Sequence, residues 1–164
     1  MELRFYSFIN FYLSPIQQGI QTAHLVHEMF NKYPIRTSAG VMDTASSDYS
    51  LYEWSENHKT IIVLNAGVDA DIQELFDAFA TLDEFPFVEF REDAGLCHAR
   101  TGVGIVLPET IFNARWVPDA YALSNGYYAY YPENYLTKPE TIVRYDATHK
   151  YWDLIRLVKS KRLA

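Results

Sequence analysis

The pattern of apolar positions begins with a nearly continuous run over residues 3–12, which is rich in Phe, Tyr, Leu and Ile. Such a run predicts a central strand that is covered on both faces. A helix is expected from Pro15 to about Lys32, because Ser14 and Gln17 have capping-box spacing and proline fits a first turn. We expect the helix to pack on the sheet through the side that carries Ile16, Ile20, Ala23, His27 and Phe30.

The remaining pattern alternates between strands and helices. Residues 34–50 have little periodicity and predict a loop, and residues 60–65 predict a short buried strand. A helix is expected from Asp71, which has capping-box spacing to Glu74, up to Asp83, and strands are expected over 87–91 and 102–107. The order β-α-β-α-β-β favours an α/β fold with a mixed, largely parallel sheet and helices on its faces.

The composition changes after Pro108, where a tyrosine-rich segment begins. We therefore divide the chain into an α/β domain over 1–108 and an extension over 109–164. Asp146 is expected to cap a final helix with an apolar stripe formed by Trp152, Leu154, Ile155 and Val158. Because such a stripe needs a partner surface, it predicts packing on the same domain or on a second copy, and hence a homodimer.

The crowded tyrosines allow two interpretations. Aromatic side chains can stack on the bases of single-stranded nucleic acid, or they can simply pack together. No Lys or Arg lies between Tyr121 and Tyr135. We therefore favour packing or an interface between copies.

Composition restricts the class of protein. The chain has 164 residues, about half of them hydrophobic, which suits one domain or a domain with an appendage. No apolar run approaches the roughly 20 residues of a membrane span, and the N-terminal residues lack a cleavage pattern. Cys97 is the single cysteine, so an internal disulfide is excluded. We expect a cytoplasmic protein with no membrane contact.

The formal net charge of −7 argues against a surface that is uniformly built for phosphate backbones. The charge is uneven, since six basic and two acidic residues lie between Arg144 and the C-terminus. Any nucleic-acid contact is expected to involve this tail. The simpler interpretation of Lys159, Lys161 and Arg162 is that they complete the last turn of the final helix.

Gln21 and His24 lie one helical turn apart and share a face of the predicted helix. Two interpretations remain open: they orient a ligand, or they make structural hydrogen bonds. His24 and Glu28 have a spacing that suits chelation, but a zinc site needs three or four ligands, and neither a zincin pattern nor paired cysteines occur. We expect no metal and no cofactor.

A second polar group follows the strand predicted over 87–91. Asp93 can act as an acid or base, or it can cap the turn around Gly95, and both interpretations stay open. Cys97 beside His98 suggests a nucleophile, but nothing identifies a separate base and orienting group. We therefore do not expect cysteine catalysis.

Four landmarks occur in a fixed order along residues 3–108. They are Gln21-Thr22-Ala23-His24, Trp54 followed by Lys59-Thr60-Ile61-Ile62-Val63, Asp93-Ala94-Gly95, and Thr101-Gly102-Val103-Gly104-Ile105-Val106-Leu107-Pro108. In pattern and order these landmarks resemble the type 2 peptidyl-tRNA hydrolase family. The resemblance covers about two-thirds of the chain.

The resemblance implies a three-layer α/β/α domain with a four-stranded mixed sheet. It also implies cleavage of the ester between a peptide and the terminal ribose of tRNA. Asp93 would activate water, Thr101 and Gln21 would position the carbonyl, and His24 would hold the site together.

The sequence departs from the family at functional positions. The family has a catalytic lysine four residues before its glutamine, where this chain has Gln17, and Cys97 replaces a family threonine. Two functions therefore stay open. One is a divergent hydrolase that acts on peptidyl-tRNA. The other is an inactive protein on the same fold that binds a protein partner, a second copy or a small nucleotide-like ligand.

Overall fold

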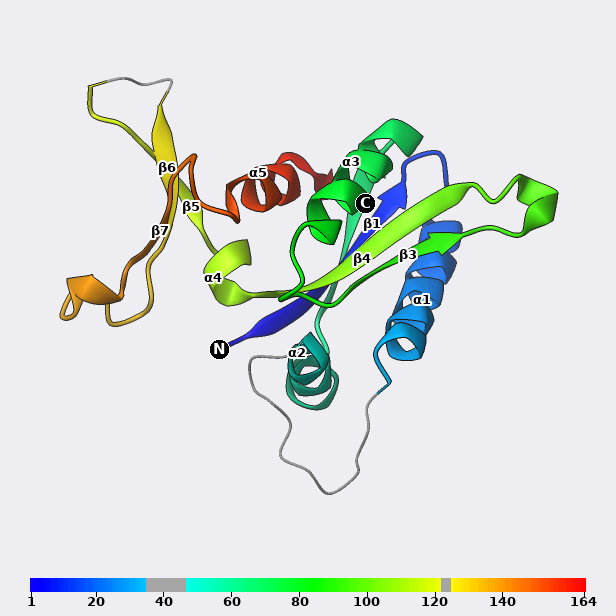
Figure 1. Ribbon diagram of the computed structural model, residues 1–164, viewed down its shortest axis with the longest axis horizontal. Coiled ribbons are helices and arrows are strands. Elements are labelled where there is room, and N and C mark those ends of the chain that lie inside the picture. Colours follow the sequence, from blue (N-terminus) through cyan, green and yellow to red (C-terminus); the bar gives the residue numbers. More distant parts are fainter. Residues whose placement is uncertain (35–46, 122–124) are drawn as a thin grey trace. The chain divides into compact units, whose positions relative to one another are not determined.

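A computed structural model describes residues 1–34, 47–121 and 125–164. The chain divides into two compact units, Met1–Leu107 together with Lys161–Ala164, and Pro108–Ser160. The elements of the first unit, labelled where there is room in Figure 1, are β1 (Leu3–Asn10), α1 (Pro15–Lys32), α2 (Ser47–Glu53), η1 (Trp54–His58), β2 (Ile61–Gly67), α3 (Asp69–Ala80), β3 (Phe87–Arg91), η2 (Ala94–Leu96), β4 (Arg100–Pro108) and β8 (Arg162–Leu163).

The first unit is built on a mixed five-stranded sheet with the order β3-β4-β1-β2-β8. The strands β1 and β2 are parallel, whereas β3 pairs with β4 and β2 pairs with β8 in antiparallel fashion. The α/β class is as predicted, but two expectations are wrong. The sheet has five strands rather than four, because Arg162 and Leu163 pair beside Asn65 and Leu64. It is not largely parallel, because the pairings at both edges of the sheet, β3 with β4 and β2 with β8, are antiparallel.

The two faces of β1 are both covered, as its continuous apolar run predicts. On one face Phe5 and Ile9 share a buried cluster with Leu25 of α1 and with Trp54. On the other face the ring of Phe8 lies 5.6 Å from that of Phe79 on α3. Helices therefore lie on both sides of the sheet, which gives three layers (Figure 1).

Helix α1 spans Pro15–Lys32 as predicted, and its capping box is formed. The backbone N–H of Ser14 donates to Oε1 of Gln17 at 3.0 Å, and the N–H of Gln17 donates to Oγ of Ser14 at 3.4 Å. The predicted packing side is wrong, since Ile16 is 78% exposed and Ile20 is 50% exposed. The buried side chains are instead Gln21, Thr22, Leu25 and Met29.

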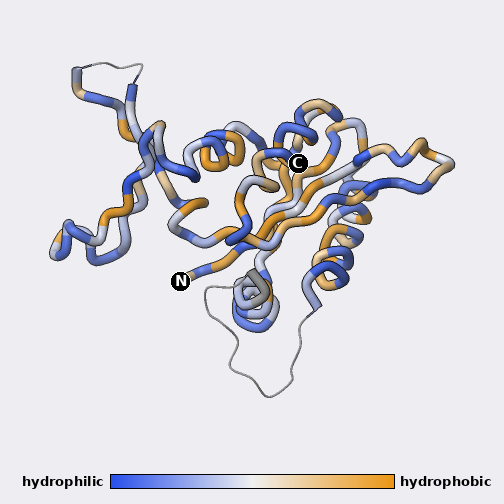
Figure 2. The backbone as a smooth tube through the Cα atoms, in the orientation of Figure 1, coloured by the Kyte–Doolittle hydropathy of each residue, from blue (hydrophilic) through white to orange (hydrophobic). Residues whose placement is uncertain are grey.

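The buried polar residues of α1 are tolerated because they have partners. The hydroxyl of Thr22 is hydrogen-bonded to that of Ser7 on β1 at 2.8 Å, and Gln21 is also bonded. Figure 2 shows apolar and polar residues interspersed along this helix. Hydrophobic periodicity alone therefore selected the wrong side.

Two other helices differ from expectation. The loop predicted over 34–50 lies mostly outside the described residues, but α2 already begins at Ser47. It leads to Trp54, whose indole N–H donates to the carbonyl of Thr60 at 2.9 Å. Helix α3 begins at Asp69 rather than at Asp71, because the carboxylate of Asp71 accepts from the backbone N–H of Val68 at 2.9 Å and so caps an earlier start. It ends at Ala80, before the expected Asp83.

The second unit contains a three-stranded antiparallel sheet that the sequence did not predict. Its elements are α4 (Glu109–Phe112), β5 (Arg115–Pro118), β6 (Gly126–Tyr130), η3 (Pro139–Thr141), β7 (Val143–Tyr145) and α5 (Trp152–Ser160). The strand order is β5-β6-β7. The buried residues of α5 are Leu154, Ile155, Leu157 and Val158.

Asp146 does not cap α5, because the helix begins only at Trp152. Its carboxylate instead accepts from the backbone N–H of Thr148 at 2.9 Å and from the Thr148 hydroxyl at 2.6 Å. Of the three cations expected in the last helical turn, Lys159 lies there, whereas Lys161 and Arg162 follow the helix. Across the described ranges, no helix combines the length and apolar character that crossing a bilayer requires.

Candidate functional site

A β-bulge at the start of β4 sets the direction of the first site residue. The pairing passes from Phe90 opposite Gly102 to Arg91 opposite Arg100, so Thr101 is the extra residue. A Cβ on Gly102 would lie 3.1 Å from Cδ1 of Leu25, which places the Gly102 side of the strand against α1. Because of the bulge, Thr101 also faces α1 instead of alternating to the opposite face.

Thr101 joins a polar cluster with Gln21 of α1 and with Glu92, which follows β3. The hydroxyl of Thr101 lies 3.2 Å from Oε1 of Gln21 and 3.4 Å from Oε1 of Glu92. The side-chain amide of Gln21 donates to the same Glu92 oxygen at 2.7 Å. We call Gln21, Glu92 and Thr101 the polar triad. Gln21 is only 8% exposed, so these hydrogen bonds hold a largely buried amide in one orientation.

His24 lies beside the polar triad without a described hydrogen bond to it. Its ring stacks on that of Phe90, with centroids 4.4 Å apart and planes 4° apart. His24 is one turn after Gln21, and Phe90 is two residues before Glu92. The stacked pair therefore ties α1 to β3 next to the triad.

Asp93 is exposed, and the hydrogen bond described for its carboxylate is with its own turn. Oδ1 of Asp93 accepts from the backbone N–H of Gly95 at 2.9 Å, and the Asp93 carbonyl accepts from the N–H of His98. Cys97 and His98 both have positive φ values, 55° and 53°. Cys97 is a free, exposed thiol. Of the four site residues taken from the sequence, the structure brings Gln21 and Thr101 into contact and places His24 beside them, while Asp93 caps the adjacent turn.

The position of the family lysine is used for capping in this chain. Gln17 accepts from the backbone N–H and from the hydroxyl of Ser14, at 3.0 and 2.9 Å. A neutral amide therefore stands where the resemblance implies a catalytic cation. In the described part of the chain, no group of three or more His, Cys, Asp or Glu residues could hold a metal ion.

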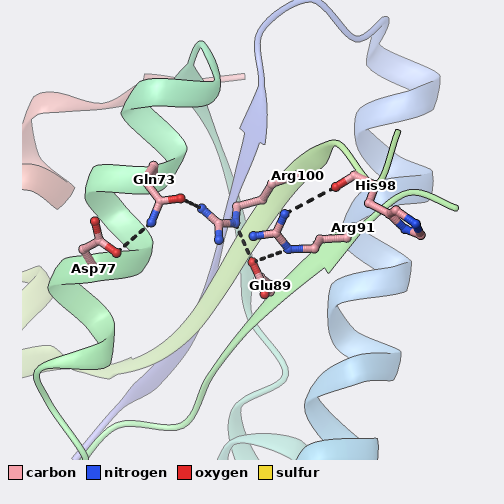
Figure 3. Close-up of polar contacts among 6 residues, drawn as sticks. All are labelled: Gln73, Asp77, Glu89, Arg91, His98 and Arg100. Atoms are coloured by element: carbon pink, nitrogen blue, oxygen red, sulfur yellow. Dashed lines mark hydrogen bonds and ion pairs between the residues drawn. The ribbon is translucent and has the colours of Figure 1, made fainter. Parts of the chain in front are cut away.

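Arg100 precedes the bulge and points to the opposite face of the sheet, toward α3 (Figure 3). Its guanidinium donates to Glu89 at 2.5 Å and to the side-chain carbonyl of Gln73, and it lies 4.5 Å from the ring centroid of Phe76. The Arg100 side chain is 5% exposed. This buried, partnered charge anchors the start of β4 on one face, while Thr101 joins the polar triad on the other.

Glu92 is the site residue that the sequence analysis missed. A signal was present, because Val88 and Phe90 alternate along β3 and Glu92 continues this two-residue spacing just past the end of the strand. Phe90 contacts His24 on α1 and Glu92 contacts Gln21 on the same helix.

No protein-family model and no curated protein matches this sequence.

Proposed function

We propose that this chain is a divergent relative of the type 2 peptidyl-tRNA hydrolases that cleaves an ester of the peptidyl-tRNA class. The observation that carries the proposal is the contact between Gln21 and Thr101. These residues were selected from two separate landmarks, 80 positions apart in the chain, and their side chains meet at 3.2 Å. The strand order β3-β4-β1-β2 within the sheet, with helices on both faces, also supports it.

The polar triad suits an ester hydrolysis that needs no lysine. Both described hydrogen bonds to the Glu92 carboxylate go to Oε1. Among the described residues Oε2 has no partner, so this oxygen is free to accept a proton from a water molecule. The water oxygen attacks the ester carbonyl, the bond to the ribose oxygen breaks, and the proton passes through Glu92 to the leaving hydroxyl. Thr101 and Gln21 orient the carboxylate and the carbonyl.

Two carboxylates compete for the role of base, and substitution separates them. We expect release of labelled peptide from peptidyl-tRNA to fall by about 100-fold or more in Glu92→Gln, because a positioned base contributes roughly that much. Asp93→Asn tests the alternative that follows from the resemblance. Glu74→Gln is the matched control, because it makes the same chemical change at an exposed position of α3. Unchanged turnover in both Glu92→Gln and Asp93→Asn would refute a carboxylate mechanism at this site.

A second candidate function is binding without catalysis, and the use of Gln17 as a cap favours it. A glutamine held by Ser14 supplies no positive charge to a developing oxyanion. In that case the wild-type protein binds a peptidyl-tRNA mimic, or a protein partner, with no turnover. Thr101→Val would then weaken binding of that ligand, and peptide release would be absent in the wild type and in every variant. The peptide-release assay on folded wild-type protein decides between the two functions.

A further inference from the structure

The sheet of the second unit places two arginines in one row. Arg115 on β5 lies opposite Ala129 on β6, and Ala129 lies opposite Arg144 on β7. Residues directly opposite each other in a sheet share a face, so both arginines flank Ala129 on the same side. Their Cα atoms are separated by two strand spacings, or about 10 Å. Both arginines are exposed, whereas Ala129 between them is fully buried.

The other face of this sheet is used for internal packing. Trp116 lies opposite Tyr128, and both rings pack against Trp152 of α5, with centroid distances of 5.8 and 5.2 Å. Tyr145, opposite Tyr128 on the other side, is buried and donates its hydroxyl to the carbonyl of Thr110. Figure 1 shows α5 beside this sheet. The arginine row therefore lies on the face of the sheet opposite to these aromatic contacts.

Tyr127 adds an aromatic ring to the arginine row. It is two residues from Ala129 along β6, so its side chain is on the same face. The guanidinium of Arg144 lies over its ring, 5.2 Å from the centroid. We call Arg115, Tyr127 and Arg144 the arginine–tyrosine face. A ring held by an arginine is a pre-formed surface on which a planar base can stack.

The arginine–tyrosine face carries two exposed positive charges, from Arg115 and Arg144. In the described part of the chain, neither Arg115 nor Arg144 forms an ion pair with a carboxylate. The pKa of Lys159 is lowered, mainly by burial and further by the charge of Arg115. The tyrosine-rich segment does not itself supply these charges, because no basic residue lies between Tyr121 and Tyr135. The sheet brings arginines from outside that stretch beside Tyr127.

We infer that the arginine–tyrosine face binds single-stranded nucleic acid, with Arg115 and Arg144 on phosphates and a base stacked on Tyr127. Arginine recognises phosphate and also stacks on planar rings, and aromatic rings hold bases of any sequence. An acidic peptide would use the arginines but would gain little from Tyr127. This inference is independent of ester hydrolysis, because it needs neither the polar triad nor an ester.

The test is binding of a fluorescent single-stranded RNA of about 12 nucleotides and mixed sequence to the full chain, followed by anisotropy. We expect Arg115→Gln and Arg144→Gln each to weaken binding about 3- to 10-fold at low salt. Each is also expected to reduce the salt slope of log K by about 0.7, because one phosphate contact is lost. Tyr127→Leu should weaken binding about 5-fold or more with little change in the salt slope.

Arg156→Gln is the matched control, because it removes the same charge from α5, where Arg156 pairs with Asp153 at 3.5 Å. It should change affinity less than about 2-fold. An unchanged near-ultraviolet circular dichroism spectrum, which reports on the packed Trp116 and Trp152, shows that each variant is folded. The inference is overturned if the wild type does not bind the RNA. It is also overturned if Arg156→Gln weakens binding as much as Arg115→Gln, or if poly-glutamate competes as well as unlabelled RNA.

Discussion

Gly104 on β4 provides a quantitative test of the packing between the sheet and its α1 side. A Cβ at this position would lie 2.5 Å from Cζ of Phe5, and 3.2 and 3.3 Å from two other ring carbons. Phe5 is completely buried, and its ring lies 5.4 Å from that of Trp54. The Phe5 ring therefore cannot move away without displacing other core residues, and Gly104→Ala is expected to destabilise the first unit.

The magnitude follows from two opposing contributions. Inserting a methyl group into a packed core typically costs about 1–3 kcal/mol. Replacing glycine reduces the entropy of the unfolded chain, which returns about 0.4–1 kcal/mol. We therefore expect the free energy of unfolding to fall by about 1–2 kcal/mol. Gly19→Ala is the matched control, because apart from the local helix backbone no atom lies within 4 Å of its Cβ position on α1. There alanine should stabilise by about 0.5–1 kcal/mol through helix propensity.

Urea unfolding followed by Trp54 fluorescence measures both changes. Trp116 and Trp152 belong to the second unit, so a background with phenylalanine at these two positions leaves Trp54 as the reporter of the first unit. The two substitutions should shift the midpoint in opposite directions with little change in the slope. The reasoning is refuted if Gly104→Ala is as stable as its parent, or if both glycine substitutions shift stability in the same direction.

Three further predictions concern single contacts. Arg100→Met should lower the free energy of unfolding by about 2 kcal/mol in the same urea assay, because it leaves Glu89 without its buried partner. Gln17→Ala should destabilise α1 by about 0.5–1 kcal/mol, measured as faster amide hydrogen exchange in its first turn. The pKa of Asp146 should lie below its usual value, because Thr148 donates two hydrogen bonds to its carboxylate, and Thr148→Val should raise it in an NMR titration.

Each of these predictions has a contrary outcome. Arg91→Met is the comparison for Arg100→Met, because the Arg91 side chain is 46% exposed, and equal losses in the two variants would contradict the role of burial. Unchanged exchange at the start of α1 in Gln17→Ala would contradict the capping box. Because its folded-state pKa is lowered, Asp146 contributes stability above its unfolded-state pKa. That contribution is lost as the pH falls through the folded-state pKa. If the free energy of unfolding falls with decreasing pH in Asp146→Asn just as it does in the wild type, this contribution is contradicted.

Several elements were predictable because short-range interactions specify them. Helix α1 and strand β3 have the predicted bounds, since a capping box and a two-residue alternation act within a few positions of the chain. Gln21 and Thr101 were selected as site residues from separate landmarks of the resemblance, whereas their contact is seen only in the structure. The role of Asp146 was mistaken, because a capping residue and a residue that forms a local turn look alike in sequence.

By itself the sequence determined the order of β1, α1, β2, α3, β3 and β4 and the start of α1, although not α2 or β8, because these features depend on residues that are close along the chain. Only the tertiary structure decided which side of α1 is buried, since this depends on partners outside the helix, such as the Ser7 hydroxyl that is hydrogen-bonded to Thr22. It also decided that Thr101 faces α1, since the bulge at the start of β4 exists only through pairing with β3. The placement of Arg115 and Arg144 in one row has the same origin, because strand pairing joins residues that are distant in sequence, and periodicity carries no information about that register.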